Sequence, residues 1–544
     1  MKANYEQWAV YQIWPRSFAD GNGDGIGDLH GVLQKLDYIK SLGVDAIWFS
    51  PLYPSPNADY GYDCADYKNI NPEYGDLELF RRVIDEAHKR DIKIIIDLVL
   101  NHTSDQHEWF KQSKVPGSKY HDYYFWRKGK GKHGKKAPNN WLSMFEGGAW
   151  EYHEDLGEHY LHVFAKGQPD LNMANSAVRE EVKDIMRFWL DMGVDGFRED
   201  VITYIAKREG LPNGFPLPIA TGYPHYTSLP KVKDYLREFK EDVLDKYDAF
   251  TVGEAPMMTT KVAKDYITGD DKVLDVMFHF QHMEADCIMN DWVATPFRLG
   301  KLKKVFKHWQ RELHGQAFNA NYMENHDHPR VIDKYGSRKF RVQSAKMLAA
   351  LYILQSGMPF IYQGQEIGMT NIELKRLDQF KDVVTFNNFN LAKKLGLSEK
   401  FFVKYANRRS RENARTPMQW SSEPNAGWAT PWFPVNENCS EINVAAAEAD
   451  PNSILHWYRA LLKFRKENPV AIYGKYRPLR TGRKLFAYES EHEGKRLVFV
   501  GSFSDKPKAF TAPKGGELVF CNYDMQQEKL QPWECRVYVQ QSRP

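Results

Sequence analysis

Short apolar runs rich in β-branched residues recur along the chain and alternate with helical patterns. "YQIWPRSF" (Tyr11–Phe18) and "AIWFSPLY" (Ala46–Tyr53) read as strands, and the stretch between them, "LHGVLQKLDYIKSLG", has the spacing of a helix. The later strand-like runs are Lys93–Asn101, Gly196–Ile202, Ala249–Ala255, Val276–Phe280, Asn321–Asp327 and Pro359–Glu366. Alternating strand and helix predict a parallel sheet, and eight such strands predict an α/β fold of the closed (β/α)8 or TIM-barrel type.

Two segments break this rhythm. Residues 102–172 are rich in Gly, Lys and aromatic residues with weak helical periodicity, which indicates a subdomain inserted after the third strand. From Tyr473 the helical patterns stop, and runs such as "LFAYES" and "RLVFVGSFS" alternate between turn residues. We therefore expect a barrel over 1–101 and 173–472, an inserted subdomain over 102–172, and a C-terminal antiparallel β-sandwich domain over 473–544.

Composition narrows the class of protein. The 74 basic residues nearly balance the 71 acidic ones, so the total charge carries no sign of a nucleic-acid or membrane partner. The five cysteines are scattered without metal-binding spacing, which fits a reducing compartment. No run approaches the ~18 apolar residues of a membrane span, and the first residues lack the pattern of a secretory signal. We expect a cytoplasmic monomer.

Acidic residues fall at the carboxyl ends of the predicted strands, where barrels place their chemistry. Asp200, Glu254 and Asp327 end the fourth, fifth and seventh strands. Two such carboxyl groups can cleave a glycosidic bond with retention, one as nucleophile and the other as proton donor. Arg198 lies two residues before Asp200 and should face the same way and keep it ionised, whereas Glu199 should face the other side.

Seven motifs in order carry a resemblance to a known family. They are "DLVLNH" (Asp97–His102), "QPDLN" (Gln168–Asn172), "GFREDVI" (Gly196–Ile202), "VGEA" (Val252–Ala255), "ENHD" (Glu324–Asp327), "IYQGQEIGMTN" (Ile361–Asn371) and "ARTPMQW" (Ala414–Trp420). Over nearly its whole length the chain resembles the α-amylase superfamily of retaining glycoside hydrolases, within its oligo-1,6-glucosidase and α-glucosidase branch.

The resemblance implies a role for each matching residue. Asp200 is implied as the nucleophile, Glu254 as the general acid/base, and Asp327 as the carboxylate that stabilises the transition state. The implied substrate-binding residues are Arg198, which orients Asp200; His102 and His326, which bond sugar hydroxyls; Asp59 and Arg415, a charged clamp around the terminal glucose; Tyr62, which stacks on that ring; and Phe164 and Gln168, which line it. A pocket closed at one end implies exo action on a small oligosaccharide, without an organic cofactor.

The loop "ADGNGDGIGDLHG" (Ala19–Gly31) has the oxygen ligands of a hard cation. Its side-chain donors are Asp20, Asn22, Asp24 and Asp28, and Ile26 would offer its backbone carbonyl. A calcium-sensing loop needs a bidentate Glu at position twelve, where this chain has Gly31. We therefore expect a structural Ca²⁺ or Mg²⁺, which the family often holds here, rather than a switch. An empty, hydrogen-bonded turn is the alternative.

Substrate preference depends on few residues. In the branch that the chain resembles, Val after the nucleophile accompanies α-1,6 activity, and this position is Val201. Glu199 and Glu324 depart from the family pattern; they either border the leaving-group site or form peripheral salt bridges.

Other substrates and functions stay open. Sucrose and α-1,4 maltosides are alternatives to isomalto-oligosaccharides. A trehalose 6-phosphate hydrolase needs a phosphate site, for which "RKGKGKHGKK" (Arg127–Lys136) is the candidate. Sucrose isomerases share the fold, but this chain has "HPRVIDKYG" where they carry an "RLDRD"-like stretch. A non-catalytic relative, such as a transporter glycoprotein subunit, would have a membrane helix and lack catalytic carboxylates.

Overall fold

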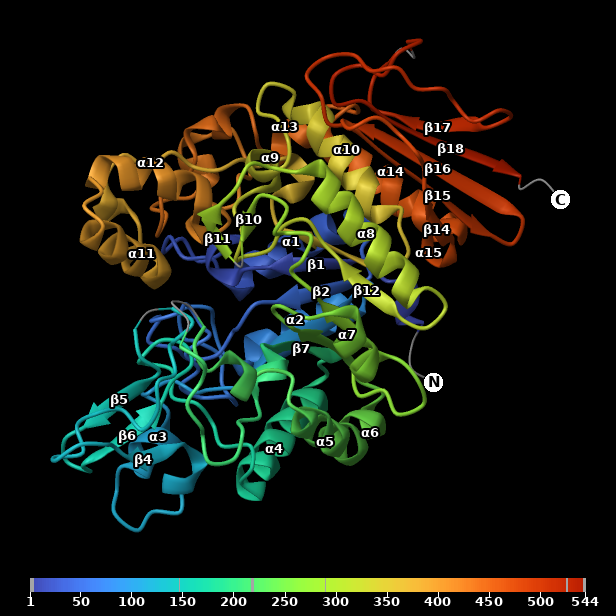
Figure 1. Cartoon of the computed structure of the whole chain (residues 1–544). Helices are drawn as coiled ribbons and strands as arrows, with labels where there is room; N and C mark the ends of the chain where they lie inside the picture. Colours follow the sequence, from blue (N-terminus) through green and yellow to red (C-terminus); the bar gives the residue numbers. More distant parts are fainter. Residues whose placement is uncertain (1–3, 146, 217–219, 289, 525–526, 542–544) are drawn as a thin grey trace.

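Eight parallel strands close into a barrel in the computed structural model, which describes residues 4–145, 147–216, 220–288, 290–524 and 527–541 (Figure 1). In barrel order they are β1 (Val10–Ile13), β13 (Met358–Tyr362), β12 (Phe318–Asn321), β9 (Val276–Phe278), β8 (Phe250–Glu254), β7 (Gly196–Asp200), β3 (Lys93–Val99) and β2 (Ala46–Phe49). Because β1 pairs with both β13 and β2, the sheet has no free edge. The predicted barrel is confirmed.

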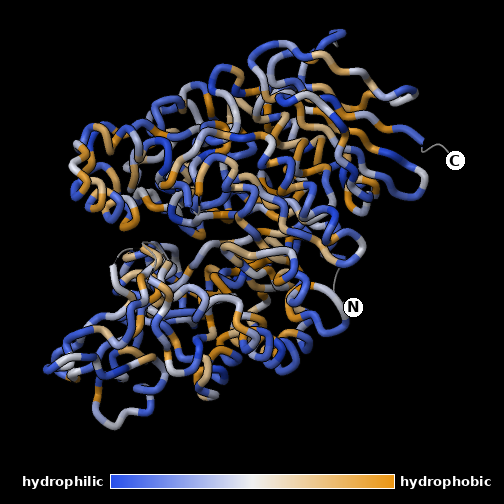
Figure 2. The backbone as a smooth tube through the Cα atoms, viewed as in Figure 1, coloured by the Kyte–Doolittle hydropathy of each residue, from blue (hydrophilic) through white to orange (hydrophobic). Residues whose placement is uncertain are grey.

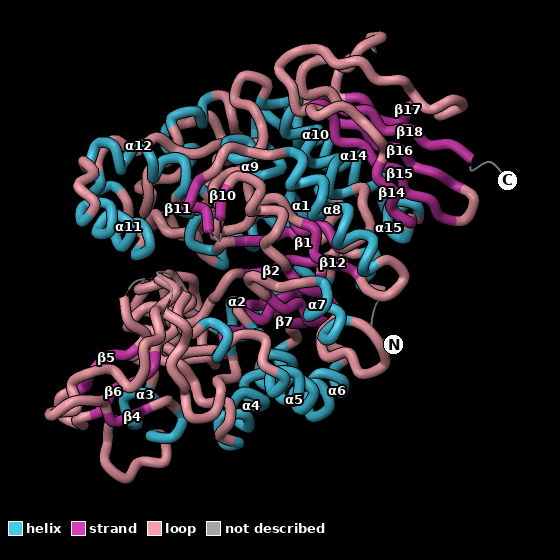
Figure 3. The backbone as a smooth tube through the Cα atoms, viewed as in Figure 1, coloured by secondary structure: helices cyan, strands magenta, loops and turns pink. Residues whose placement is uncertain are grey.

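A ring of helices covers the outside of the barrel (Figure 3). The principal ones are α1 (Leu29–Leu42), α2 (Leu77–His88), α4 (Ser176–Met192), α5 (Pro230–Phe239), α7 (Thr260–Ile267), α8 (Leu299–Leu313), α10 (Arg341–Ile353) and α14 (Ile454–Glu467). Every residue of β1, β2 and β13 is buried, as expected for strands covered on both faces. Figure 2 shows hydrophobic positions concentrated inside and hydrophilic ones along the outer loops.

The seventh strand ends earlier than predicted. We expected it to span Asn321–Asp327, but β12 pairs with β13 only as far as Asn321. The polar residues that follow leave the barrel as a loop, consistent with the low strand propensity of Asn and Asp. Asp327 therefore lies on a loop beyond the strand, whereas Asp200 and Glu254 are the last residues of β7 and β8.

Three segments rise from the carboxyl ends of the strands. The insert after β3 holds α3 (Glu108–Ser113) and a small sheet of β4 (Trp126–Lys128), β6 (Glu158–Leu161) and β5 (Trp150–His153), and is otherwise mostly loop (Figure 3). A hairpin of β10 (Cys287–Ile288) and β11 (Asn290–Ala294) follows β9, and two helices, α11 (Val383–Lys394) and α12 (Glu399–Arg409), follow β13. The bounds 102–172 for a subdomain stay a prediction.

The C-terminal strands form one five-stranded antiparallel sheet. Its order is β14 (Lys475–Pro478), β15 (Leu485–His492), β16 (Lys495–Ser502), β18 (Cys535–Gln541) and β17 (Glu517–Cys521). The antiparallel domain is confirmed. Within the described residues, however, the layer facing this sheet comes from helices such as α10 and α15 (Val470–Tyr473) rather than from a second sheet, so the expected sandwich is helical on one side.

Two features bear on the expected compartment. None of the helices in the described residues combines the length and apolarity needed to cross a membrane. All five cysteines lie in the described part of the chain and none forms a disulfide.

Candidate active site

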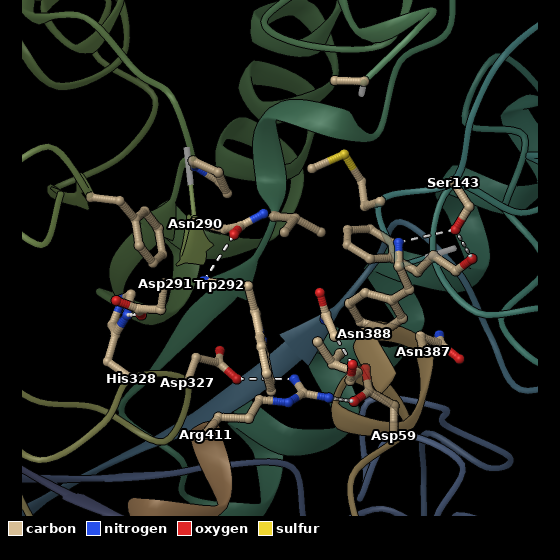
Figure 4. Close-up of a pocket in the computed structure, with 18 of the residues that line it drawn as sticks. Asp59, Ser143, Asn290, Asp291, Trp292, Asp327, His328, Asn387, Asn388 and Arg411 are labelled. Carbon is tan, nitrogen blue, oxygen red and sulfur yellow. Dashed lines mark hydrogen bonds and ion pairs between the residues drawn. The ribbon is translucent and has the colours of Figure 1, made fainter. Parts of the chain in front are cut away.

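A cavity of about 640 Å³ opens at the carboxyl ends of the barrel strands, and Asp200, Glu254 and Asp327 all line it. Figure 4 shows part of its wall, with Asp327 beside Arg411 and Asp59. Five more of the residues predicted from the sequence line the same cavity: Asp59, Tyr62, His102, Phe164 and Val201. The structure thus brings together carboxylates from β7, β8 and the loop after β12.

Arg198 forms hydrogen bonds with three carboxyl groups and so fixes their relative positions. Its Nη1 donates to Asp97 Oδ1 at 2.6 Å and to Asp200 Oδ1 at 2.8 Å, and its Nη2 donates to Glu254. The guanidinium is almost completely buried. Because alternate side chains of a strand share a face, Arg198 and Asp200 of β7 both point into the barrel end, as predicted.

Burial raises the pKa of two of the carboxyl groups around Arg198, those of Asp200 and Asp97. Burial raises the pKa of Asp200 well above its usual range; Arg198 opposes this rise, and Glu254 and Asp97 add to it. Burial likewise raises the pKa of Asp97 to about 6. Arg198 therefore lowers the pKa of Asp200, as expected, but burial raises this pKa by more. The raised pKa favours a proton on Asp200 in the free protein, whereas a retaining mechanism needs Asp200 ionised and its partner carboxyl protonated.

Asp327 is ionised. Burial alone would raise its pKa, but His326, Arg411 and Arg415 together lower the pKa well below its usual range. His326 Nε2 lies 3.1 Å from Asp327 Oδ2. The amide of Gln12 donates to His326 Nδ1 at 2.8 Å, which leaves the ring proton on Nε2, between the Tyr62 hydroxyl at 2.8 Å and Asp327.

The ion pair that Asp59 forms in the pocket differs from the predicted one. Arg411 Nη2 donates to Asp59 Oδ1 at 2.6 Å, and Arg411 Nη1 lies 3.1 Å from Asp327 Oδ1. Arg415, predicted as the partner of Asp59, instead donates to Asp327 at 3.1 Å and to Asp382 at 2.9 Å. Sequence reasoning missed Arg411, although it lies only four residues before Arg415.

Other predicted binding residues surround this pair. Gln168 Nε2 lies 3.2 Å from Asp59 Oδ2 and 3.1 Å from His102 Nε2, just behind the lining. Burial lowers the pKa of His102 to about 4, so the ring is neutral at physiological pH. Phe164 contacts His102, with 5.2 Å between ring centroids. The Tyr62 hydroxyl donates to Asp97 at 3.0 Å.

Val201 turns the chain sharply beside Asp200. Its φ of 35° and ψ of 41° lie in the left-handed region, which is strained for a β-branched residue. Its amide lies 3.4 Å from Glu254 Oε2, and its side chain lines the pocket. The turn lets a side chain one position beyond Asp200 face the same cavity.

Glu199 and Glu324 do not line the pocket, which corrects our grouping of them with the specificity residues. Glu199 points away from it by strand alternation and is fully buried, and within the described structure neither of its carboxyl oxygens has a hydrogen-bond partner. Glu324 pairs with the buried Arg330 at 3.0 Å and accepts from the amide of Val331 at 2.8 Å. Both are structural residues of the scaffold.

The predicted cation loop is closed by its own hydrogen bonds. Asp20 accepts from the amides of Gly23 and Gly25, and Asp28 from those of Gly21, Asn22 and Gly31. The last of these bonds caps α1. The predicted metal ligands Asp24 and Ile26 lie in the same turn, where the Ile26 amide donates to Asp24 Oδ1 at 2.8 Å. The oxygen donors suit Ca²⁺ chemically, but in the described structure Asp20, Asp24 and Asp28 do not converge as one ligand group.

The outer wall was not predicted. Asn290, Asp291 and Trp292 come from the β10–β11 hairpin, and Asn387 and Lys394 come from α11. No linear motif marks these residues, because they meet only through tertiary packing. The basic run 127–136 contributes no residue to the lining.

Three comparisons place the chain among known proteins. The family model described as "Alpha amylase, catalytic domain" matches residues 12–474. An oligo-1,6-glucosidase of Parageobacillus thermoglucosidasius is 45% identical over 98% of both chains, and a trehalose-6-phosphate hydrolase of Bacillus subtilis is 40% identical over 99% of both. A solved trehalose-6-phosphate hydrolase of Bacillus licheniformis superposes with a TM-score of 0.94 at 38% identity, covering 98% of this chain and 99% of that one. With this match and these relatives, the chain belongs to the α-amylase family of glycoside hydrolases.

Proposed function

We propose that this protein is a retaining, exo-acting α-glucosidase that releases terminal glucose from short α-1,6-linked isomalto-oligosaccharides. One observation carries the proposal: Asp200 and Glu254 bond to the two terminal nitrogens of a single guanidinium, in a pocket whose inner end is closed by Asp59 and Arg411.

The short bridge through Arg198 supports a retaining mechanism. Retaining enzymes need carboxyl groups ~5–5.5 Å apart, whereas inverting enzymes need ~6.5–9.5 Å to admit a water. In the proposed reaction Asp200 attacks the anomeric carbon as Glu254 protonates the departing oxygen. Glu254 then takes a proton from water, which hydrolyses the glycosyl–Asp200 bond. The ionised Asp327 stabilises the positive charge that develops on the sugar.

The closed inner end supports exo action. Asp59 and Arg411 occupy the space that a second sugar would need beyond the terminal glucose, and they offer charged partners to its hydroxyl groups. A polymer chain therefore cannot pass through the pocket, and only a chain end reaches Asp200.

Two observations favour an uncharged α-1,6 substrate. The methyl groups of Val201 narrow the leaving-group side, and an α-1,6 linkage has an extra rotatable bond that lets its aglycone turn aside. Glu284 on the outer wall disfavours a phosphate, and the wall residue Arg409 is already engaged by Asp286 at 2.6 Å. The named relatives include both activities, so trehalose 6-phosphate remains the second candidate, with sucrose and maltosides after it.

A substrate panel tests the proposal. The kcat/KM should be highest for isomaltose among isomaltose, maltose, sucrose, trehalose and trehalose 6-phosphate. Glucose should leave first as the α-anomer, as followed by proton NMR. The highest value on trehalose 6-phosphate would replace the proposal with a phosphosugar hydrolase.

Three further properties belong to this proposal. Ca²⁺, or Mg²⁺, would stabilise the Asp20–Asp28 loop without taking part in the reaction, which the oxygen-only donor set supports. Five unpaired cysteines are consistent with a reducing, cytoplasmic location. The monomeric state stays a prediction that sedimentation velocity can check.

A further inference from the structure

An aromatic side chain on the outer wall of the pocket, that of Trp292, is held in a fixed orientation. Trp292 of the β10–β11 hairpin lines the cavity and is half-buried. Its ring packs parallel to that of Phe402 on α12, with centroids 5.8 Å apart and 7° between planes. The hydroxyl of Tyr405, also on α12, donates to the Trp292 carbonyl at 2.6 Å. These contacts fix the indole plane.

Buried ion pairs anchor the base of this hairpin. The ammonium group of Lys334 contacts Asp286 Oδ1 at 2.8 Å and also bonds to Asp291. Arg409 of α12 binds the other oxygen of Asp286, and His328 Nδ1 lies 2.6 Å from Asp291 Oδ2. Although Asp286, Cys287 and Asp291 lie close enough to hold a metal, Lys334 and Arg409 already neutralise these carboxylates. The network therefore serves to hold the hairpin.

The opposite side of the mouth is polar. Asn387 and Lys394 of α11 line it, and Leu391 beside them is 55% exposed, which places this part of the pocket at its opening. The Asn387 side chain makes no hydrogen bond within the residues that the structure describes, so its amide is available to a ligand. Figure 4 shows Asn290, Trp292 and His328 on one side of the cavity and Asn387 with Asn388 on another.

We propose that Trp292 is a stacking platform for the leaving group, and that it binds the second glucosyl unit beyond the cleaved bond. The first leaving-group unit has its own neighbours beside the catalytic carboxyls, namely Val201, Pro256 and Met257. A further unit reaches the mouth, where the C–H face of a pyranose can lie on the indole while its hydroxyls meet Asn387. The inference rests on the proposed α-glucosidase activity and adds a preference for substrates of three glucosyl units or more.

Length-dependent kinetics test this. Wild type, Trp292→Ala, Trp292→Phe and the control Phe401→Ala would be assayed on isomaltose, isomaltotriose and isomaltotetraose. Phe401 is an exposed aromatic residue of α12 outside the pocket lining. We expect wild type to favour isomaltotriose over isomaltose about tenfold in kcat/KM, the low end of what one contact supplies. Trp292→Ala should abolish this ratio by raising KM for isomaltotriose with kcat kept, since binding alone is lost. Trp292→Phe should retain part of it, and Phe401→Ala all of it.

The other outcomes separate the possibilities. If wild type shows no preference for isomaltotriose, Trp292 does not bind a second glucosyl unit. The same conclusion follows if the preference survives Trp292→Ala. An equal loss on all three substrates together with a lower melting temperature shows that Trp292 only docks the hairpin on α12. If wild type hydrolyses neither isomaltose nor p-nitrophenyl α-glucoside, the proposed function itself fails, and the inference fails with it.

Discussion

Arg411 donates a 2.6 Å hydrogen bond to Asp59, and both residues line the pocket that also contains Asp200 and Glu254. The two residues are 352 positions apart in the sequence. Arg411 also contacts Asp327 and Asp382, so one guanidinium orders carboxylates from three loops. Burial raises the pKa of Asp59 to about 6 against the opposing effect of Arg411, which shows how strongly this carboxylate depends on its partner.

We predict that Arg411→Ala lowers kcat/KM by a factor of about 100 or more, because it removes the cation that holds Asp59 and Asp327 in the pocket. Leaving these charges uncompensated should also lower the folding stability, by about 3–5 kcal/mol. Arg411→Lys should recover little, since a single ammonium cannot reproduce the fork. Steady-state kinetics on p-nitrophenyl α-glucoside would measure both. Arg376→Ala, which breaks an exposed pair with Asp378, is the control; similar kinetics for Arg411→Ala and Arg376→Ala would contradict the assignment.

Catalysis should depend on both central carboxyl groups. Asp200→Asn and Glu254→Gln are each expected to lower kcat by a factor of roughly 10⁴ or more, since each removes one member of a single mechanism. Melting temperatures within a few degrees of wild type would show that the fold is intact. Release of the β-anomer as the first product of the wild-type enzyme would refute the retaining assignment.

Linkage preference should shift at Val201. Val201→Thr keeps the β-branched shape that the left-handed turn already tolerates but replaces one methyl with a hydroxyl. The ratio of kcat/KM for isomaltose over maltose should fall, within the roughly 10–200-fold range that small steric changes produce. Glu324→Gln, which alters the buried pair with Arg330 outside the pocket, is the comparison and should leave the ratio unchanged. If Val201→Thr leaves the ratio of isomaltose to maltose activity unchanged, residues of the outer wall set the linkage preference instead.

Glu199 should make stability depend on pH. Burial, and then Asp275, raise its pKa from 4.5 in the unfolded reference to about 8. A raised carboxyl pKa means that the folded state holds a proton which the unfolded state has lost. Folding stability therefore falls as pH rises from about 4.5 to 8, by about 1.4 kcal/mol per pH unit, and the full penalty persists above that window.

Glu199→Gln replaces this carboxyl group with an amide that does not ionise. Calorimetry at pH 5.5 and pH 8 should show a smaller drop in melting temperature for Glu199→Gln than for wild type. Glu493→Gln, which changes an exposed glutamate, is the matched control and should follow wild type. An equal drop in melting temperature for Glu199→Gln and wild type would mean that a compensating group stabilises the ionised carboxylate of Glu199.

Metal removal should affect stability more than activity. If Ca²⁺ binds the Asp20–Asp28 loop, chelation should lower the melting temperature by several degrees, because the ion binds only the folded state. Activity at room temperature should change little, since the loop provides no residue to the pocket lining. Elemental analysis of protein prepared without chelator should find about one divalent ion per chain; its absence would leave the hydrogen-bonded turn as the whole structure of the loop.

Local patterns in the sequence determined much of this protein. The alternation of apolar runs and helical periods predicted the barrel, because strands buried on both faces must be apolar and their covering helices amphipathic. Strand alternation also placed Arg198 with Asp200 on one side and Glu199 on the other, since a strand's side-chain period is two residues. The positions of the carboxylates at the ends of β7 and β8 could therefore be predicted from the sequence alone.

Only the tertiary structure decided which distant residues meet. Sequence spacing did not reveal that Asp59 pairs with Arg411 rather than Arg415, or that Trp292 lines the pocket and packs on α12, because loop ends are positioned by packing between segments far apart in the sequence. Glu324 was equally ambiguous, since its role depends on whether the loop after β12 turns it toward the cavity or toward Arg330. Local periodicity sets the direction of a side chain within a strand, but the neighbours of a loop residue depend on the whole fold.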